Sequence, residues 1–534
     1  MLQLEHDGGL KAFLNGQEIY KGEKPTPRWN PRNDFNVCDH RRFDQETRVP
    51  RVEAVFKPGW NRLLLKALDG SHATVQWGER EDIPYRTKNI RWVTRLPDWG
   101  TGSPIVVKDR VFVGCEPDLL VCLDKKTGQR LWTRHVPIAA AVTEEDRKAH
   151  PELAKLDPLL KDLEAEGATV ANGVKARKAM QAILDAADKD RFAWPKSKGL
   201  PASGYSFPTP TSDGEHVYVF FANSIAACFD LEGRRIWIRN LIPEIATVEN
   251  GLHGPNGSFN MSAPLLLGDK LILLRDYLCA LDKRTGELLW KAPPLLEKYV
   301  DKSHDRKELK ERYNTNFSTS PAACRFGGED LIVCASFAVV RASDGELLCL
   351  GDKLVPRTNP RAGFVWDGAN TIWYCGPRYF AFDGAPDQTK KGGCEYARGM
   401  LDPGDSYVAP LYHEGLVYHM GMGGVLAVGD AASAKILYSK MLDLSPWFSH
   451  WTFGCSSSPT LGGSHVFIMD NQLNVVVLKP GREYRQVALN RIDNFLPRRE
   501  AERWQDSPMS NPVFDADCIY IRGERDLFCI GATP

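Results

Sequence analysis

The clearest pattern in the chain is a short arrangement of apolar and polar positions that occurs four times. An apolar stretch leads into a polar turn that ends in Gly, and a second stretch then closes on a large residue. The four copies span residues 121–132, 227–237, 279–290 and 339–349. Two strands joined by a Gly-containing turn form a β-hairpin. One hairpin recurring about every 45–55 residues is typical of a β-propeller.

Further repeats are marked by Ser, Thr or Ala close to a proline that precedes an apolar stretch. These prolines are Pro104, Pro210, Pro264, Pro321, Pro410, Pro459 and Pro512. A weaker copy without the proline spans 364–382, with Trp373 and Asp383. The pattern therefore predicts an all-β, eight-bladed propeller. A seven-bladed ring with an irregular segment at 355–400 is the alternative.

The two ends of the repeat region complete each other. Residues 89–97 have the pattern of an outer strand, but no earlier strands of a blade precede them. Residues 510–530 have the pattern of a blade that stops before its outer strand. Pairing the two fragments would close the ring and remove its free edges. The propeller is thus expected to cover 89–534.

Two segments fall outside the repeat. Residues 1–80 are β-rich, with a hairpin expected around Asn15-Gly16, and form a partial, sandwich-like extension. An insertion at 139–198 is helical by pattern: Thr143 to Asp146 is an N-terminal capping signal, and leucines follow at helical spacing. A second helix is expected at 174–187, after a turn bracketed by Gly167 and Gly173. One interpretation is that the helical hairpin lies flat on the surface of the ring. The alternative is that it serves as a lid over one face or as an arm that contacts a protein partner.

Charge and composition limit the classes of partner that the sequence suggests. The chain has 68 Lys plus Arg and 68 Asp plus Glu, so it lacks the basic excess expected of a nucleic-acid-binding protein. It has no apolar run of about 20 residues that would predict a transmembrane segment, and its start has no signal-peptide pattern. Three of its 13 cysteines, Cys122, Cys228 and Cys529, occupy one repeat position, which predicts small buried apolar residues.

The repeat Leu-Asp-x-x-Thr-Gly-x-x-x-Trp, best seen at 103–132 and 262–290, resembles that of the pyrroloquinoline-quinone-type propeller superfamily. This superfamily includes quinoprotein alcohol dehydrogenases and the propeller of the bacterial outer-membrane assembly machine, and the latter, non-enzymatic type is the nearer resemblance. The N-terminal piece is similar to the end of a galactose-binding-like jelly roll. The resemblance implies a periplasmic or extracellular protein, while the absence of a signal peptide leaves the cytoplasm open.

The repeat residues themselves have structural roles. Asp124 and Thr127 are expected to cap their own turn, and Gly128 and Gly286 to supply a positive φ. The large apolar faces of Trp132, Trp237 and Trp290 suit packing between blades.

The resemblance also raises the question of a quinone cofactor. Quinoprotein dehydrogenases resemble one another in a pair of adjacent cysteines, a Trp beneath the quinone and a Glu/Asn/Asp set around Ca²⁺. The chain has no adjacent cysteines and no acidic stretch typical of a calcium loop. Pyrroloquinoline quinone with calcium is therefore disfavoured, and we expect no cofactor and no metal.

Candidate binding residues lie just before each innermost strand, where the blades of a propeller meet at one mouth of the channel. Aromatic faces next to amides, imidazoles and carboxylates suit a carbohydrate or another small polar ligand. The alternative is that these side chains fill the channel and cap strand starts. The candidates are Trp99, Tyr205, His253, Asn256, Asn260, Asn316, Asp405, Tyr407, His450, Trp451, Trp504 and Asp506.

A ligand-binding or scaffolding propeller is the leading hypothesis, and an enzyme at the mouth is the alternative. His253 or His450 as base with Tyr407 as acid would suit a polysaccharide lyase. Asp405 with Asp506 would suit glycoside hydrolysis. A degenerate quinoprotein dehydrogenase is the third enzymatic possibility. His419, within a predicted strand, is interpreted as a core histidine with satisfied hydrogen bonds.

Overall fold

The computed structural model describes residues 2–6, 10–15, 17–22, 51–52, 63–67, 73–77, 89–164, 170–192, 204–245, 262–275, 277–293, 320–334, 338–350, 363–374, 378–386, 389–391, 406, 408–444, 454–492, 510–523 and 525–532. The chain divides into two compact units. One comprises Met1–Arg86 with Ile492–Arg498, and the other comprises Thr87–Arg491 with Arg499–Pro534.

The smaller unit contains two three-stranded sheets. One has the order β4-β1-β6, from strands β1 (Leu2–His6), β4 (Arg51–Val52) and β6 (Ala73–Trp77). The other has the order β3-β2-β5, from β2 (Leu10–Leu14), β3 (Gln17–Gly22) and β5 (Leu63–Ala67). The β2–β3 hairpin turns at Asn15, whose φ of 51° is the left-handed conformation that such a turn requires. The predicted hairpin is confirmed.

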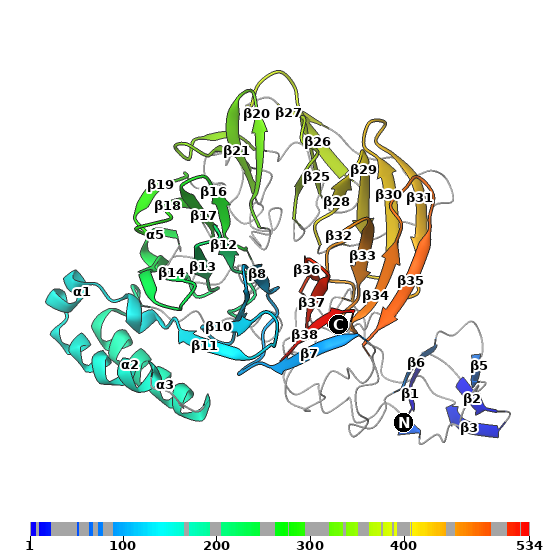
Figure 1. The fold of residues 1–534 in the computed structure, drawn as a ribbon, viewed down its shortest axis with the longest axis horizontal. Helices are drawn as coiled ribbons and strands as arrows, with labels where there is room; N and C mark the ends of the chain where they lie inside the picture. Colours follow the sequence, from blue (N-terminus) through cyan, green and yellow to red (C-terminus); the bar gives the residue numbers. More distant parts are fainter. Residues whose placement is uncertain are drawn as a thin grey trace. The chain divides into compact units, whose positions relative to one another are not determined.

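The larger unit is a propeller. Within its described residues the strands form eight four-stranded antiparallel sheets, arranged around a common axis in Figure 1. We number these sheets as blades 1 to 8 in chain order. The prediction of an eight-bladed propeller is confirmed, and the seven-bladed alternative was wrong, because residues 363–391 form a complete blade 5.

The strands of blades 1 to 4 follow in chain order. Blade 1 has β8 (Ile105–Val107), β9 (Arg110–Cys115), β10 (Leu119–Asp124) and β11 (Arg130–His135). Blade 2 has β12 (Thr211–Ser212), β13 (His216–Phe220), β14 (Ile225–Asp230) and β15 (Arg235–Asn240). Blade 3 has β16 (Leu265–Leu267), β17 (Lys270–Leu274), β18 (Leu278–Asp282) and β19 (Leu288–Lys291). Blade 4 has β20 (Ala322–Phe326), β21 (Glu329–Cys334), β22 (Ala338–Arg341) and β23 (Leu347–Leu350).

Blades 5 to 8 repeat the same order. Blade 5 has β24 (Val365–Trp366), β25 (Thr371–Tyr374), β26 (Arg378–Phe382) and β27 (Thr389–Lys391). Blade 6 has β28 (Leu411–His413), β29 (Leu416–Met420), β30 (Val425–Asp430) and β31 (Lys435–Met441). Blade 7 has β32 (Thr460–Gly462), β33 (His465–Met469), β34 (Asn474–Leu478) and β35 (Gln486–Arg491). Blade 8 has β36 (Val513–Asp515), β37 (Cys518–Arg522), β38 (Asp526–Gly531) and, from the other end of the repeat region, β7 (Ile90–Arg95).

Blade 8 closes the ring as predicted. Strand β7 is the outer strand of the sheet β36-β37-β38-β7, and Trp92 stands opposite Cys529 in the register. Residues more than 400 positions apart are thus joined by a ladder of backbone hydrogen bonds. Each such pairing removes an exposed strand edge, so β7 closes the ring.

The tryptophans of the repeat join neighbouring blades. Each Trp packs over the turn glycine of the next blade, and its indole Nε1 donates to a carbonyl of the same turn. Trp237, for example, lies over Gly286, where an added Cβ would be 2.7 Å from the ring, and it donates to the Lys283 carbonyl at 2.9 Å. We call this arrangement a Trp–Gly seam. The four seams pair Trp92 with Gly128, Trp132 with Gly233, Trp237 with Gly286, and Trp290 with Gly345.

The other predicted roles of the repeat residues are also confirmed. The Asp124 carboxylate accepts hydrogen bonds from the backbone and hydroxyl of Thr127, at 2.7 and 2.8 Å. Gly128 and Gly286 both have a φ of 72°. Cys122, Cys228 and Cys529 are buried in the core with free thiols. Sequence reasoning missed that the glycines are needed twice, once for φ and once to make room for the Trp of the preceding blade.

A second set of contacts joins the blades near the axis. At five junctions, the residue before a strand-starting proline donates its backbone N–H to a side-chain oxygen at the same position of the next blade. Ser103 donates to Thr209 (3.1 Å), Ala263 to Ser320 (2.9 Å), Ala409 to Ser458 (3.1 Å), Ser458 to Asn511 (2.7 Å) and Asn511 to Ser103 (2.9 Å). The last bond joins blade 8 to blade 1.

The insertion is helical as predicted. It comprises η3 (Ile138–Ala141), α1 (Glu144–Ala149), η4 (Pro151–Lys155), α2 (Leu156–Glu164) and α3 (Val170–Asp188), and α5 (Ile242–Ile245) follows blade 2. The Thr143–Asp146 capping box is present. Leu153, Leu156 and Leu163 are buried in one cluster with residues of blades 1 and 2, so the insertion extends the propeller core.

One boundary was wrong. Gly173 was expected in the turn before the second helix, but α3 begins at Val170 and includes it. A Cβ at this position would lie 3.0 Å from Nη1 of Arg177 and 3.7 Å from Leu163 of α2. The contact with Leu163 is at an ordinary van der Waals distance, and the closer approach is to Arg177 of the same helix. Within the described ranges, no helix has the length and apolar character needed to cross a membrane.

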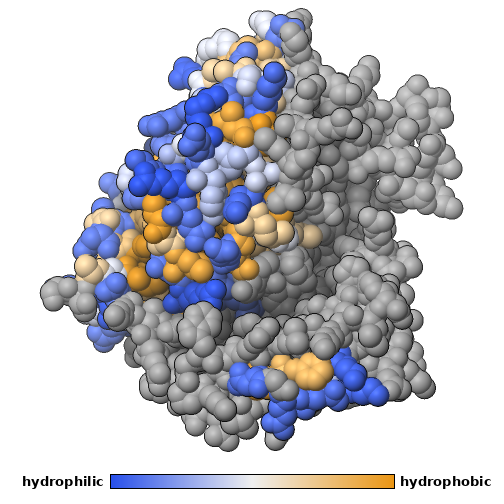
Figure 2. Space-filling view, turned by 90° about the vertical axis from the view of Figure 1, so that its right-hand side faces the viewer, coloured by the Kyte–Doolittle hydropathy of each residue, from blue (hydrophilic) through white to orange (hydrophobic). Residues whose placement is uncertain are grey.

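The outer strands leave some apolar side chains in solvent. Met441 on β31 and Val487 on β35 are 51% and 45% exposed. Figure 2 looks onto the side of the molecule that carries these strands and shows apolar patches between hydrophilic residues. Such scattered apolar residues are ordinary for a protein surface.

Candidate functional site

Two of the twelve predicted mouth residues, Trp99 and Tyr205, belong to the described part of the chain. Each lies a few residues before an innermost strand, β8 for Trp99 and β12 for Tyr205. Both are 8% exposed. Within the described residues they therefore offer little open ring surface for a ligand to stack on.

A buried glutamate that was not predicted brings the two aromatic residues together. The Glu116 carboxylate accepts hydrogen bonds from the backbone N–H of Tyr205 (2.9 Å), the backbone N–H of Ser206 (2.7 Å) and the Ser206 hydroxyl (2.6 Å). Its own backbone N–H donates to the Trp99 carbonyl at 2.9 Å. Glu116 thus ties the loop before β12 to the loop before β8.

A buried arginine holds the loop before β8 from the other side. Arg522, the last residue of β37, is fully buried and donates from Nη1 to the Gly102 carbonyl at 2.8 Å. Its Nη2 contacts the Cys115 thiol at 3.7 Å. A Cβ at Gly100 would lie 3.0 Å from the guanidinium carbon and 2.6 Å from the Ser206 hydroxyl. Residue 100 must therefore be glycine for the loop to lie over the guanidinium.

Burial dominates the ionisation of this cluster. Removal from water raises the pKa of Glu116 to about 7, although its hydrogen bonds from Ser206 and Tyr205 oppose the shift. Burial also lowers the pKa of Arg522 and raises the pKa of the Cys115 thiol to about 11. With its oxygens already occupied by three donors, Glu116 acts as a brace for the loops, and the neutral Cys115 thiol is a poor nucleophile.

The sequence does contain a signal for Arg522. Arg522 pairs with Leu527 in the register, and the corresponding position holds Phe220 in blade 2 and Met420 in blade 6. A charged residue at a core position of a strand calls for a buried partner. Glu116 gave a weaker signal, since it stands in a turn where polar residues are common.

The other ten predicted residues lie outside the described part of the chain: His253, Asn256, Asn260, Asn316, Asp405, Tyr407, His450, Trp451, Trp504 and Asp506. The acid–base pairs considered for a lyase or a glycoside hydrolase are all among them. Both ideas remain predictions.

The expectation that the protein binds no quinone and no calcium stays a prediction. Across the described ranges, no three His, Cys, Asp or Glu side chains are grouped so that they could hold a metal ion. The sequence has no adjacent cysteines.

His419 is in the core, but its hydrogen bonds differ from the prediction. The side chain on β29 is 2% exposed, and neither ring nitrogen has a hydrogen-bond partner among the described residues. The ring faces Trp373 of blade 5, with centroids 6.2 Å apart. The indole nitrogen of Trp373 is likewise unpartnered within the described set. The expectation of a satisfied histidine was wrong, because the neighbouring blade presents an aromatic residue at this point.

Comparison with known proteins gives a family match without a close relative. Residues 44–154 and 74–251 match the family model described as outer membrane protein assembly factor BamB. No curated protein matches the chain.

Among solved structures, the chain is similar to BamB from Moraxella catarrhalis, with 10% identity over 83% of this chain and 99% of that chain and a TM-score of 0.45. It is also similar to the quinohemoprotein alcohol dehydrogenase from Comamonas testosteroni, with 12% identity over 83% and 76% of the two chains and a TM-score of 0.45. A europium-containing methanol dehydrogenase matches at 11% identity, covering 83% and 93%, with a TM-score of 0.45.

The family model matches the region in which the repeat begins, and blades 1 to 3 carry the Asp, Gly and Trp residues of that repeat at equivalent positions. Residues 44–251 therefore resemble the PQQ-like β-propeller repeats that the BamB family model describes, and the described sheets form a propeller.

Proposed function

We propose that this protein is a ligand-binding or scaffolding propeller whose binding face is the channel mouth formed by the loops before the innermost strands. The observation that carries the proposal is the buried bracing of two such loops. Glu116 and Arg522 fix the loops that hold Trp99 and Tyr205 through hydrogen bonds of 2.6–2.9 Å. Burying two charged groups is costly. Its benefit would be a preorganised loop surface, and preorganisation strengthens binding.

The ligand class that we propose is a carbohydrate. Its support is the residue types of the predicted mouth set, in which aromatic rings accompany amide, imidazole and carboxylate groups. The family description, which refers to outer-membrane protein assembly, supports a location in the cell envelope. It also supports the scaffolding side of the proposal, in which the helical insertion is the candidate contact for a protein partner.

Calorimetric titration of the full chain with a panel of neutral and acidic oligosaccharides would test the carbohydrate proposal. We expect saturable binding that Ser206→Ala and Arg522→Lys, which each remove part of the brace beneath the mouth loops, weaken severalfold. Trp132→Phe is the matched control, because Trp132 belongs to a Trp–Gly seam and not to the mouth. Absence of binding across the panel, or equal weakening by the control, would contradict the proposal.

A further inference from the structure

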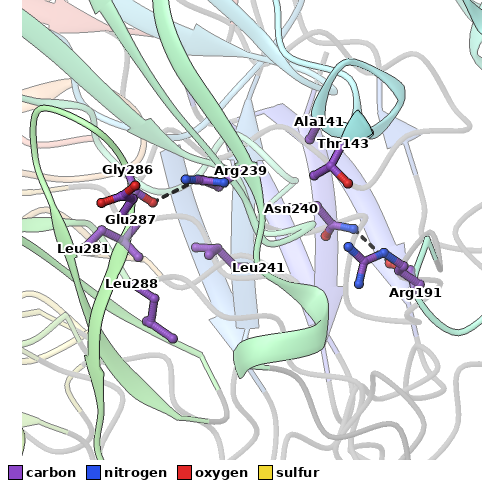
Figure 3. Close-up of a pocket in the computed structure, with 10 residues that line it drawn as sticks. All are labelled: Ala141, Thr143, Arg191, Arg239, Asn240, Leu241, Leu281, Gly286, Glu287 and Leu288. Atoms are coloured by element: carbon purple, nitrogen blue, oxygen red, sulfur yellow. Dashed lines mark hydrogen bonds between the residues drawn. The ribbon is translucent and has the colours of Figure 1, made fainter. Parts of the chain in front are cut away.

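A pocket at the rim of the propeller is lined by ten residues, none of which belongs to the predicted mouth set (Figure 3). We call it the rim pocket. Its volume is about 180 Å³, and its walls come from the beginning and end of the helical insertion, from the end of β15 in blade 2 and from the β18–β19 hairpin of blade 3. Neither the repeat pattern nor the proposed mouth function accounts for it.

Hydrogen bonds between these segments fix the walls. Asn240 donates from Nδ2 to the carbonyl of Arg191 at 2.8 Å, which ties blade 2 to the end of the insertion. Arg191 in turn pairs with Asp146 of α1, with Nε and Oδ1 2.6 Å apart. On the opposite side, Arg239 donates from Nε to the Gly286 carbonyl at 3.0 Å, and Figure 3 shows the Asn240 and Arg239 bonds. The pocket is thus held in place by contacts that do not need a ligand.

The charges in the pocket favour an anion. Arg239 forms no ion pair with any residue that the structure describes, and its hydrogen bond to a carbonyl leaves its charge unneutralised. Arg191 contributes a second guanidinium group, but its charge is already balanced by Asp146, so Arg239 is the cation that favours an anion. Glu287 is the one carboxylate among the lining residues, and it lies exposed on the hairpin turn. A guanidinium group offers paired N–H donors whose geometry matches a carboxylate.

The remaining wall is aliphatic. Leu281 is fully buried and Leu241 is 3% exposed, so both form a closed apolar surface. Leu288 is 45% exposed at the opening. A ligand that fits both parts of the pocket therefore carries a negative group and a short apolar segment. An engineered cavity of about 150 Å³ holds benzene, which indicates a ligand portion of roughly that size.

We propose that the rim pocket binds an aliphatic carboxylate, with Arg239 as the principal contact for the carboxylate and the leucines as the contact for the chain. A free dicarboxylic acid and the acidic side chain of a partner peptide share this chemistry. The site is separate from the proposed mouth, so it stands or fails independently of carbohydrate binding.

The probes are glutarate, its neutral analogue glutaramide, and an acetylated, amidated Leu-Glu-Leu peptide, each titrated into the full chain by calorimetry or ligand-observed NMR. We expect glutarate or the peptide to bind and glutaramide not to bind. The probe of higher affinity identifies the source of the carboxylate. Arg239→Gln should weaken binding about tenfold or more, because it removes a hydrogen bond assisted by a full charge.

Blade 1 supplies a matched control. Arg134 donates from Nε to the Gly233 carbonyl at 2.7 Å, as Arg239 does to Gly286, but it does not line the pocket. Arg134→Gln should therefore leave binding unchanged. Glu287→Gln removes the one lining carboxylate from an exposed turn and should strengthen binding severalfold, which provides a second test if Arg239→Gln is poorly folded.

Three outcomes would overturn the proposal. The first is that neither glutarate nor the peptide binds, and the second is that glutaramide binds as well as glutarate. The third is that Arg134→Gln weakens binding as much as Arg239→Gln. The last result would show that the arginines act through the contact between blades.

Discussion

The two arcs of the propeller are held together by different means. From blade 8 through blades 1, 2 and 3 to blade 4, every junction is a Trp–Gly seam. We call these blades the Trp-docked arc. In the remaining junctions, the register position of the Trp holds Cys349 in blade 4, Tyr438 in blade 6 and Ala488 in blade 7. We call the blades from 4 round to 8 the variable arc.

Each junction of the variable arc has its own packing. Phe326 stacks on Phe382 between blades 4 and 5, with centroids 4.6 Å apart. Tyr438 meets Tyr484 edge-on between blades 6 and 7, at 6.1 Å. Phe467 and Phe514 lie 4.6 Å apart between blades 7 and 8. The comparison shows that the four-stranded blade does not depend on the Trp–Gly seam, because aromatic residues at other positions fill the same junctions.

Removal of a seam tryptophan should give the largest effect. Trp237→Ala deletes a ring that is 8% exposed and packed between blades 2 and 3, and truncation of a buried aromatic residue costs about 3–5 kcal/mol. We expect a clear fall in the free energy of unfolding, measured by denaturant titration.

The neighbouring residue is the control for that variant. Ile236 is 42% exposed on the same strand, so Ile236→Ala should cost less than about 1 kcal/mol. Equal losses for the two variants would mean that the seam does not stabilise the Trp-docked arc.

The glycine of the same seam should come next. Gly286→Ala places a Cβ 2.7 Å from the Trp237 ring at a φ of 72°. The left-handed conformation costs about 1–2 kcal/mol and overpacking about 1–3 kcal/mol more. Gly415, in the variable arc, has a φ of 76° but open space around it, so Gly415→Ala should show only the conformational cost.

A double-mutant cycle separates the two contributions. In the Trp237→Ala background the steric part of the Gly286→Ala loss should disappear, since residues in contact show non-additive effects. Strict additivity of the two losses would argue against a clash with Trp237.

The same comparison explains which parts of the fold were predictable. The hairpins of blades 1 to 4 were recognised because the Asp cap, the turn glycine and the final large residue recur with fixed spacing. Blade 5 was the weakest prediction because its contacts use residues such as Phe382 and Trp373, which follow no repeat. Gly173 was misplaced because a glycine suggests a turn, whereas an isolated glycine is also tolerated inside a helix such as α3.

The site was less predictable than the fold for a similar reason. The loops before the innermost strands could be located by counting repeats, but their bracing could not. Arg522 and Gly102 are 420 positions apart in the chain. Ring closure brings them together, and no local pattern around either residue indicates the contact.

The pH dependence of stability can be compared between the two arcs, because each arc contains a buried histidine. Burial, with a smaller effect of Arg177, lowers the pKa of His135 to about 4, although Asp118 opposes the shift. Burial alone lowers the pKa of His419 to about 3. In both cases the unfolded chain takes up a proton near pH 6.5, before the folded chain does. Stability should therefore fall as the pH drops from 6.5 towards these values, by up to about 2 kcal/mol per histidine at pH 5.

Substitution should remove this dependence differently in the two arcs. His135 accepts from Arg177 at 2.8 Å, so His135→Gln should flatten the pH profile and cost some stability at pH 7. The ring nitrogens of His419 have no hydrogen-bond partner among the described residues. His419→Phe should therefore flatten the pH profile of stability with little or no loss of stability at pH 7. Unfolding curves at pH 7.5, 6 and 5 give both quantities. An unchanged slope for either variant would show that the histidine does not control it.

The smallest expected effect concerns the inner hydrogen bonds, which both arcs use. Ser103 accepts from the Asn511 backbone at 2.9 Å, where blade 8 meets blade 1. Ser103→Ala leaves that N–H without its acceptor and should cost about 1 kcal/mol, read from the unfolding midpoint, while Ser103→Thr should keep the bond. Natural alanines at the equivalent positions 263 and 409 supply no such oxygen, so single bonds are dispensable. If Ser103→Ala instead approached the cost of Trp237→Ala, closure of the ring at blade 8 would depend on the inner bonds more than on the Trp–Gly seam.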